Sequence, residues 1–138
     1  MKRAATIILA AAALVMAHGA SALWSLGTSG SGVVSGKTMG GVVNAPTGSV
    51  SSHDVSLTWT GVQFTDGTNV PAYVVKRYDA VTNALQVVLS SCAGLVGGPA
   101  CIEHAVPTGT WKYTITPATG TKWRGTESAQ SSVVVILL

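Results

Sequence analysis

The sequence predicts an all-β fold, a single antiparallel β-sandwich, and three observations support this. After residue 45, apolar and polar residues alternate within short segments, and this period of two is typical of a strand with one buried face. Turn residues such as Gly, Pro, Asn and Asp separate the segments at intervals of about 8 to 15 residues, as in antiparallel sandwiches. No helical periodicity follows residue 22. We therefore expect strands joined by turns.

Residues 1–22 have the three parts of an export signal. A positively charged start precedes an apolar run from Ala4 to Ala17, and Ala20-Ser21-Ala22 fits an A-x-A cleavage site. The run is shorter than the roughly 20 residues that a membrane-spanning helix needs, which favours a cleaved signal helix over a retained anchor. If it is retained, a helix extended through Leu23-Trp24 would hold the protein to the membrane. We therefore expect a secreted or cell-surface protein.

Residues 23–44 are rich in Gly, Ser and Thr with isolated valines. They offer too little apolar surface to offset the entropy lost on ordering, so we expect a flexible arm before a domain at 45–138. Within the arm, Val42-Val43 would suit an added edge strand, and contact with a partner would order the arm.

The net charge argues against nucleic acid as a partner. The chain has eight Lys and Arg residues against five Asp and Glu, a formal net charge of +3. Lys2 and Arg3 belong to the export signal, so six bases remain and the mature chain has a net charge of about +1. Nucleic-acid binding needs a basic patch or stripe, and the sequence has none.

Six segments have the pattern of strands, and they are 55–59, 72–78, 84–90, 102–106, 111–116 and 131–138. In the fifth, Trp111, Tyr113 and Ile115 alternate with polar residues, which predicts a strand with an aromatic inward face. The last is almost entirely apolar. We expect it to be paired or covered on both faces, because an exposed edge of this kind invites aggregation.

Four blocks of sequence within residues 45–138 resemble a fibronectin type III or related immunoglobulin-like domain. Leu57-Thr58-Trp59 is similar to the L-x-W of strand B, and the segment 73–77 is similar to the Y-x-V-x-R of strand C. Segments 107–115 and 123–128 resemble the P-G-T-x-Y-x-V of strand F and the W-x-G-x-x-S that leads into strand G. The resemblance implies a Greek-key sandwich of about seven strands, with the tryptophan of strand B buried between the sheets. The spacing leaves open whether Trp111 or Tyr113 takes the tyrosine position of strand F.

The N-terminus has a resemblance of its own. The segment 19–25, followed by a Gly- and Thr-rich stretch, is similar to the export signal and first mature residues of bacterial biofilm-fibre and camelysin-like surface proteins. Leu26 stands where those proteins carry an acidic residue. The resemblance implies a bacterial origin and a role at the cell surface or in a matrix.

Cys92 and Cys101 are the only cysteines, and eight residues rich in Gly separate them. An exported chain keeps such a pair oxidised, so we predict a disulfide that staples a loop. Closing a loop of about ten residues stabilises a fold by about 2.5 to 3 kcal/mol in the chain-entropy model. The pair cannot be the inter-sheet disulfide of antibody domains, because neither cysteine lies in the strand B or strand F block. It also lacks the C-x-x-C spacing of a redox site.

Three patterns resemble sites of chemistry. Segment 32–38 is similar to a phosphate-binding loop, but only three residues separate its glycines and no helix is expected after it. His53-Asp54 and Glu103-His104 are pairs of metal-ligating types. Adjacent residues on a strand point to opposite faces, so a metal site would need both pairs to meet, and we expect polar surface residues in turns. No nucleophile elbow or H-E-x-x-H motif occurs, so we predict no catalytic residue, metal or cofactor.

Trp123 and Arg124 fall in a predicted loop, where ligand-binding residues gather, and they are the candidate ligand contacts. Trp59 and Trp111 are expected in the core. The predicted function is an exported, non-catalytic structural or adhesive module that contacts other surface or extracellular proteins, or further copies of itself. The alternative is an accessory carbohydrate-binding module that contacts glycans through an exposed aromatic platform.

Overall fold

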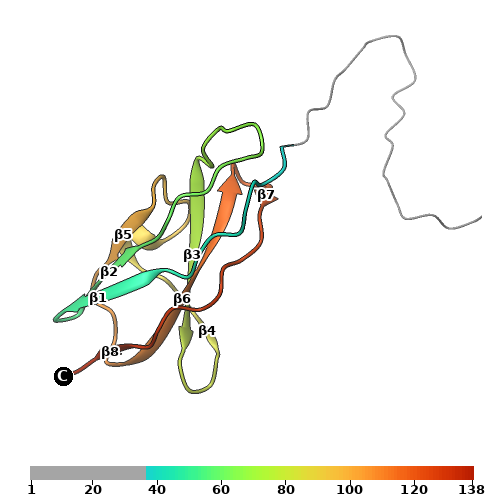
Figure 1. The fold of residues 1–138 in the computed structure, drawn as a ribbon. Helices are drawn as coiled ribbons and strands as arrows, with labels where there is room; N and C mark the ends of the chain where they lie inside the picture. The colour runs from blue at the N-terminus through green and yellow to red at the C-terminus, as the bar shows by residue number, and fades with distance from the viewer. Residues whose placement is uncertain (1–36) are drawn as a thin grey trace, which may run out of the picture. The chain divides into compact units, whose positions relative to one another are not determined.

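The computed structural model describes residues 37–138, so the predicted export signal with its expected helix and residues 23–36 of the predicted arm lie outside the described residues. The described chain forms strands and one short 3-10 turn (Figure 1). These elements are β1 (Thr47–Ser51), β2 (Asp54–Thr58), β3 (Ala72–Asp79), β4 (Leu85–Gln86), η1 (Ser90–Cys92), β5 (Ala100–Glu103), β6 (Gly109–Thr119), β7 (Trp123–Arg124) and β8 (Val134–Ile136). Within this range, no helix has the length and apolar character needed to cross a membrane.

The strands form two antiparallel sheets. The first sheet has the order β1-β2-β5, and the second has the order β4-β3-β6-β7, with β8 also paired to β6. β7 and β8 lie along the same edge of β6, with Trp123 opposite Thr119 and Val134 opposite Trp111. They therefore act as one interrupted last strand. This arrangement confirms the predicted Greek-key sandwich of about seven strands.

Two serines bridge the interruption between β7 and β8. The Ser128 N–H donates to the Ile115 carbonyl (2.8 Å), and the Ile115 N–H donates to Ser128 Oγ (2.9 Å). Ser131 and Tyr113 repeat this exchange at 2.8 and 3.0 Å. The serines are three residues apart and their partners two, which is the geometry of a bulge. After this bulge, regular pairing resumes over Val134–Ile136, inside the predicted strand 131–138.

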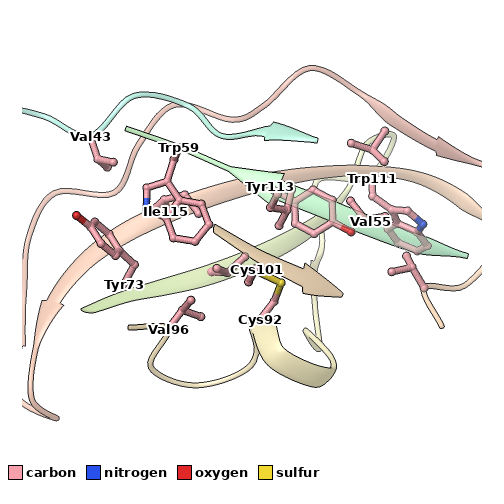
Figure 2. Packing of buried hydrophobic residues seen from close by; sticks show 14 of the residues in the cluster. Val43, Val55, Trp59, Tyr73, Cys92, Val96, Cys101, Trp111, Tyr113 and Ile115 are labelled. Atoms are coloured by element: carbon pink, nitrogen blue, oxygen red, sulfur yellow. A yellow bond between two sulfur atoms is a disulfide. The ribbon is translucent and has the colours of Figure 1, made fainter. Parts of the chain in front are cut away.

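The core lies between the sheets and contains the aromatic residues that the alternation predicted (Figure 2). Trp59 is 8% exposed and meets Tyr73 edge to face, with ring centroids 5.4 Å apart. Trp111, Tyr113 and Ile115 all lie on the inward face of β6 and are buried. The expected core positions of both predicted tryptophans are confirmed.

Glu103 also lies in the core, which corrects the expectation of a surface residue in a turn. Its carboxylate is fully buried and accepts hydrogen bonds from Arg77 Nη1 (2.5 Å), the Tyr113 hydroxyl (2.9 Å) and the Leu89 N–H (2.8 Å). Arg77 is 4% exposed, and its guanidinium lies 4.9 Å from the centroid of the Trp111 ring. Buried charges persist when they are paired and hydrogen-bonded, and both conditions hold here.

The same ion pair shortens the predicted strand 84–90 to the two residues of β4. Arg77 Nη2 donates to the Val87 carbonyl (2.8 Å), and the Leu89 N–H donates to the buried glutamate of β5. These contacts hold residues 87–89 beside the buried ion pair, and the pairing with β3 ends at Gln86. Val87 is consequently 77% exposed instead of covering the core.

The predicted strand 102–106 is displaced to Ala100–Glu103. Ala105 adopts a left-handed backbone conformation, with φ of 56°, and this conformation ends the strand. The next residue, Val106, is fully buried, and its N–H donates to the His53 carbonyl (2.8 Å).

Residues 37–44, which the sequence assigned to the flexible arm, contact the sandwich instead. The Gly40 N–H donates to the Gln63 carbonyl (2.9 Å), and the Thr38 carbonyl accepts from the Thr65 N–H (2.8 Å). Val43 is 2% exposed and belongs to the core, although it forms no strand. This part of the arm is ordered because its last valine supplies apolar surface to the core.

Candidate interaction surfaces

The predicted disulfide is confirmed, and it joins Cys92 in η1 to Cys101 in β5 with an S–S length of 2.06 Å. The bridge holds η1 against the outer edge of β5. There, Ser91 Oγ donates to the Ile102 carbonyl (2.6 Å) and accepts from the Ile102 N–H (3.2 Å). A serine side chain thus occupies both backbone groups that an added strand would need. The free edge of β5 is closed at this residue.

Trp123 and Arg124, the candidate ligand contacts, form β7 in the hairpin that follows β6. The Trp123 ring is half-buried and packs edge to face with Phe64, with ring centroids 5.4 Å apart. Arg124 is exposed, and its Nη1 donates to the carbonyls of Gly120 (2.9 Å) and Trp123 (2.8 Å). Part of the Trp123 ring is therefore used in packing, and Arg124 is exposed to solvent. Their contact with a ligand stays a prediction.

Of the four residues in the two histidine pairs, only His104 and Asp54 contact each other through their side chains. His104 Nδ1 lies 3.0 Å from Asp54 Oδ2, and this hydrogen bond lowers the pKa of Asp54. His53 Nδ1 instead lies 3.0 Å from the Val106 carbonyl oxygen, and Glu103 is used inside the core. In residues 37–138, no group of three or more His, Cys, Asp or Glu side chains is placed to hold a metal ion.

On the outer face of the second sheet, Glu127 accepts hydrogen bonds from Lys76, Tyr78 and Thr114, and these four residues are called the Glu127 cluster below. Its Oε2 accepts from Lys76 Nζ (2.5 Å), and its Oε1 accepts from the Tyr78 hydroxyl (2.8 Å) and Thr114 Oγ1 (2.5 Å). Partial burial would raise the pKa of Glu127, but the three donors outweigh it and hold the pKa below its usual value. The hydrogen bond to Glu127 raises the pKa of Lys76. Both side chains are therefore charged at neutral pH.

The pairing of β6 with β8 determines where the backbone groups of β8 point. The Thr110 carbonyl accepts a hydrogen bond from the Ala80 N–H (2.9 Å) at the end of β3, and so points away from β8. Directions alternate along a strand, so the next residue, Trp111, turns its N–H and C=O toward its partner Val134. By the same alternation, the N–H and C=O of Val135 point outward, away from β6.

The residues in and beside β8 whose backbone groups point away from β6 are aliphatic. Val133, Val135 and Leu137 are 50%, 47% and 74% exposed. Among the described residues, their backbone groups take part in none of the hydrogen bonds found outside the strand ladders. These three residues, called the β8 edge below, combine free main-chain groups with exposed apolar side chains. In the described part of the chain, the last strand is thus paired on one side only.

A wide hollow of about 1000 Å³ lies at the end of the sandwich beside the 61–71 loop. Glycines form much of its wall, among them Gly61, Gly97 and Gly98, and none of its lining side chains is charged. The Tyr73 hydroxyl in the wall accepts a hydrogen bond from the Val62 N–H (3.0 Å). The lining contains no carboxylate and no histidine, and Tyr73 is its one side chain with a titratable group.

Sequence reasoning missed both Ser91 and the Glu127 cluster. The place of Ser91 beside a predicted disulfide cysteine was its only signal. For the cluster, alternation along 72–78 places Lys76 and Tyr78 on the outer face, and that signal was available. Their partner Glu127 lies 51 and 49 residues further along the chain, where no local pattern links it to them.

No protein-family model matches the chain, and no curated protein matches it significantly in sequence. Solved structures match its fold. "Titin kinase and its flanking domains" has a TM-score of 0.55 at 16% identity, covering 68% of this chain and 16% of that one. The twitchin kinase region from C. elegans has a TM-score of 0.53 at 12% identity, covering 70% of this chain and 17% of that one. Titin module A71 from human cardiac muscle has a TM-score of 0.52 at 14% identity, covering 67% of this chain and 88% of that one.

These similarities show the fold, an immunoglobulin- or fibronectin type III-like β-sandwich, and confirm the resemblance of residues 45–138. The chain spans less than a fifth of the first two structures and most of the third. The likeness of the N-terminus to camelysin-like surface proteins concerns residues outside the described range, and it stays a prediction.

Proposed function

We propose that this chain is an exported, non-catalytic structural or adhesive module that acts through protein–protein contact at the β8 edge. The observation that supports it most directly is the coincidence, at Val133, Val135 and Leu137, of free backbone groups and exposed aliphatic side chains. An extended segment that paired with this edge would gain main-chain hydrogen bonds and bury apolar surface at the same time.

The other strand edges suit this role less well. Ser91 already occupies the edge of β5. β4 is two residues long, and Arg77 binds the Val87 carbonyl that follows it. β1 exposes mainly Thr and Ser side chains, which offer little apolar surface to a partner. The β8 edge therefore remains the best place for an added strand.

The first partner we propose is a second copy of the chain. In an antiparallel pairing of two β8 strands centred on Val135, Val133 of one copy lies opposite Leu137 of the other, so aliphatic side chains meet. Residues 131–138 contain no charged side chain, and no like charges would therefore face each other. Other surface or extracellular proteins with a free apolar strand fit the same edge.

Two features support export and a non-catalytic role. The A-x-A signal predicts export, and a disulfide such as Cys92–Cys101 forms and persists outside the reducing cytosol. The uncharged lining of the wide hollow favours contact over chemistry.

Sedimentation of the secreted, oxidised protein over a concentration series tests the proposal. We expect the wild type to form dimers as concentration rises, and Val135→Lys to stay monomeric because an edge lysine opposes strand pairing. Val81→Lys is the matched control, since Val81 is 85% exposed in the turn between β3 and β4. Equal association of V135K and the wild type would contradict the assignment of this edge. A wild type that stays monomeric and also fails to adhere to cells would contradict the adhesive function.

Retention on insoluble glycans, lost in Trp123→Ala, is the result that would favour the carbohydrate-binding alternative. Among the described residues, Trp59 and Trp111 are buried and Trp123 packs against Phe64. None of these three tryptophans presents a fully free aromatic platform, so the geometry favours protein contact.

A further inference from the structure

A second hollow lies on the outer face of the second sheet, beside the Glu127 cluster. It measures about 290 Å³, and its wall comes from β3, β6, β7 and the chain that follows β7. The lining residues are Val74, Lys76, Thr116, Arg124, Gly125 and Glu127. Val74 and Thr116 are cross-strand partners, so an aliphatic side chain and a hydroxyl lie next to each other in the wall.

Within residues 37–138, the hydroxyl of Thr116 has no hydrogen-bond partner. The residue is 7% exposed, and its Oγ1 is buried and unpaired. Thr114, two residues earlier on the same face, shows the usual outcome, because its hydroxyl donates to Glu127. Burying a polar group without a partner costs stability, so an unpaired hydroxyl in the wall of a hollow calls for an explanation such as a bound group.

The charged groups around the hollow leave an excess of hydrogen-bond donors. Glu127 already accepts three hydrogen bonds, and Lys76 balances its charge. Arg124 adds a further positive charge, and within the described chain only its Nη1 donates. The remaining N–H groups of Arg124 and the hydroxyl of Thr116 therefore have no acceptor among the residues that the structure describes. A ligand that completes this site carries negative charge and accepts hydrogen bonds.

We propose that this hollow binds a small organic carboxylate. One carboxylate oxygen accepts from the guanidinium of Arg124, which favours planar, forked recognition, and the other accepts from Thr116. The flexible ends of Lys76 and Arg124 move to admit the ligand to the buried hydroxyl. Val74 provides an apolar wall for the carbon atoms attached to the carboxylate, which an inorganic sulfate would leave unused. The site goes beyond the proposed adhesive function and does not depend on it.

An amide NMR titration of the whole oxidised protein with sodium acetate tests the site, with sodium chloride at equal ionic strength as the reference. We expect saturable shifts at Thr116 and Gly125 with acetate alone. Arg124→Gln is expected to weaken acetate binding about tenfold or more, because a charge-assisted hydrogen bond is lost. Lys122→Gln removes an exposed charge from the same hairpin outside the hollow, and it is expected to bind acetate like the wild type.

Thr116→Val tests the hydroxyl, because valine keeps the shape of threonine. Acetate binding is expected to weaken about three- to tenfold, while the ligand-free variant melts at the same temperature as the wild type or higher. Glucuronate and N-acetylglutamate, titrated in parallel, show whether an acidic sugar or an acidic amino acid binds more tightly, and either ranking supports a carboxylate site. Shifts that do not saturate, wild-type affinity in R124Q or T116V, or binding of sulfate but not acetate would overturn the proposal.

Discussion

Replacing Arg77 with methionine is expected to lower the free energy of unfolding by about 3 to 5 kcal/mol. Arg77 is 4% exposed, and its Nη1 lies 2.5 Å from Oε1 of Glu103, so the change leaves a fully buried carboxylate without its counter-charge. Methionine is long and flexible enough to fill much of the space. The loss therefore comes mainly from charge and hydrogen bonding.

Three contacts make up this cost. The unpaired carboxylate of Glu103 is the largest, although the Tyr113 hydroxyl still donates to it. The Val87 carbonyl loses its donor, which costs about 1 kcal/mol. The ring of Trp111 loses a cation at 4.9 Å, worth about 0.5 to 2 kcal/mol. Since domains are stable by only about 5 to 15 kcal/mol, this single change removes a large part of the total.

Urea unfolding of the oxidised protein, followed by tryptophan fluorescence, measures the effect. Lys76→Met is the matched control, because Lys76 is the adjacent residue on β3 and pairs with Glu127 at 2.5 Å, but its side chain is 36% exposed. Its loss is expected to cost about 1 kcal/mol or less. The double variant Arg77→Met with Glu103→Leu is expected to be more stable than R77M, since it leaves no buried charge. Equal costs for R77M and K76M would refute the reasoning that burial determines the value.

Three further predictions concern the disulfide, alkaline pH and the packing of β1. Replacing Cys92 and Cys101 with serine is expected to cost about 2.5 to 3 kcal/mol in urea unfolding and, by releasing η1 from β5, to increase aggregation measured by light scattering; an unchanged urea midpoint would contradict this. Burial and the nearby carboxylate raise the pKa of Tyr113, so the folded protein keeps a proton that the unfolded chain loses above about pH 10. The contribution of Tyr113 to the free energy of unfolding is therefore present in full below about pH 10, and above that pH it falls by up to about 1.4 kcal/mol per pH unit. Tyr113→Phe should flatten this slope in urea titrations at several alkaline pH values. Gly48→Ala places a Cβ 2.8 Å from Val134 Cγ2, and we expect this overpacking to cost about 1 to 3 kcal/mol and to lower the Tm measured by calorimetry. An unchanged Tm would contradict this and would mean that β1 and β8 separate without penalty.

The fold was predictable where alternation is continuous. The segment 111–116 was predicted with the correct inward face, because its period of two reports one uninterrupted buried surface. The segment 84–90 has the local pattern of a strand, yet hydrogen bonds from Arg77 to Val87 and from Leu89 to Glu103 redirect it. Contacts of this kind join separate strands, and a window of neighbouring residues does not contain them.

The interaction surfaces were predictable only where chemistry leaves a single choice. Two cysteines allow one intramolecular pairing, and that disulfide is present. Thr116 gave no signal, and Ser91 gave none beyond its place beside a cysteine, because serine and threonine are common and their role depends on which polar groups lie opposite them in the folded chain. Glu103 lies in the core and not at the predicted surface, because its buried carboxylate has a counter-charge, Arg77, that only the fold brings near.

The short β4 strand limits how many modules strand pairing can join. The second sheet ends at β4 on one side, where only two residues are regular, so it can be extended only from the other side. Two copies joined through β8 use up both available edges, and a third copy finds none in that continuous sheet. Each module can therefore pair with only one other module through this edge, and assembly by this contact stops at the dimer. An open-ended filament or network would need a second contact, of different chemistry, on every module.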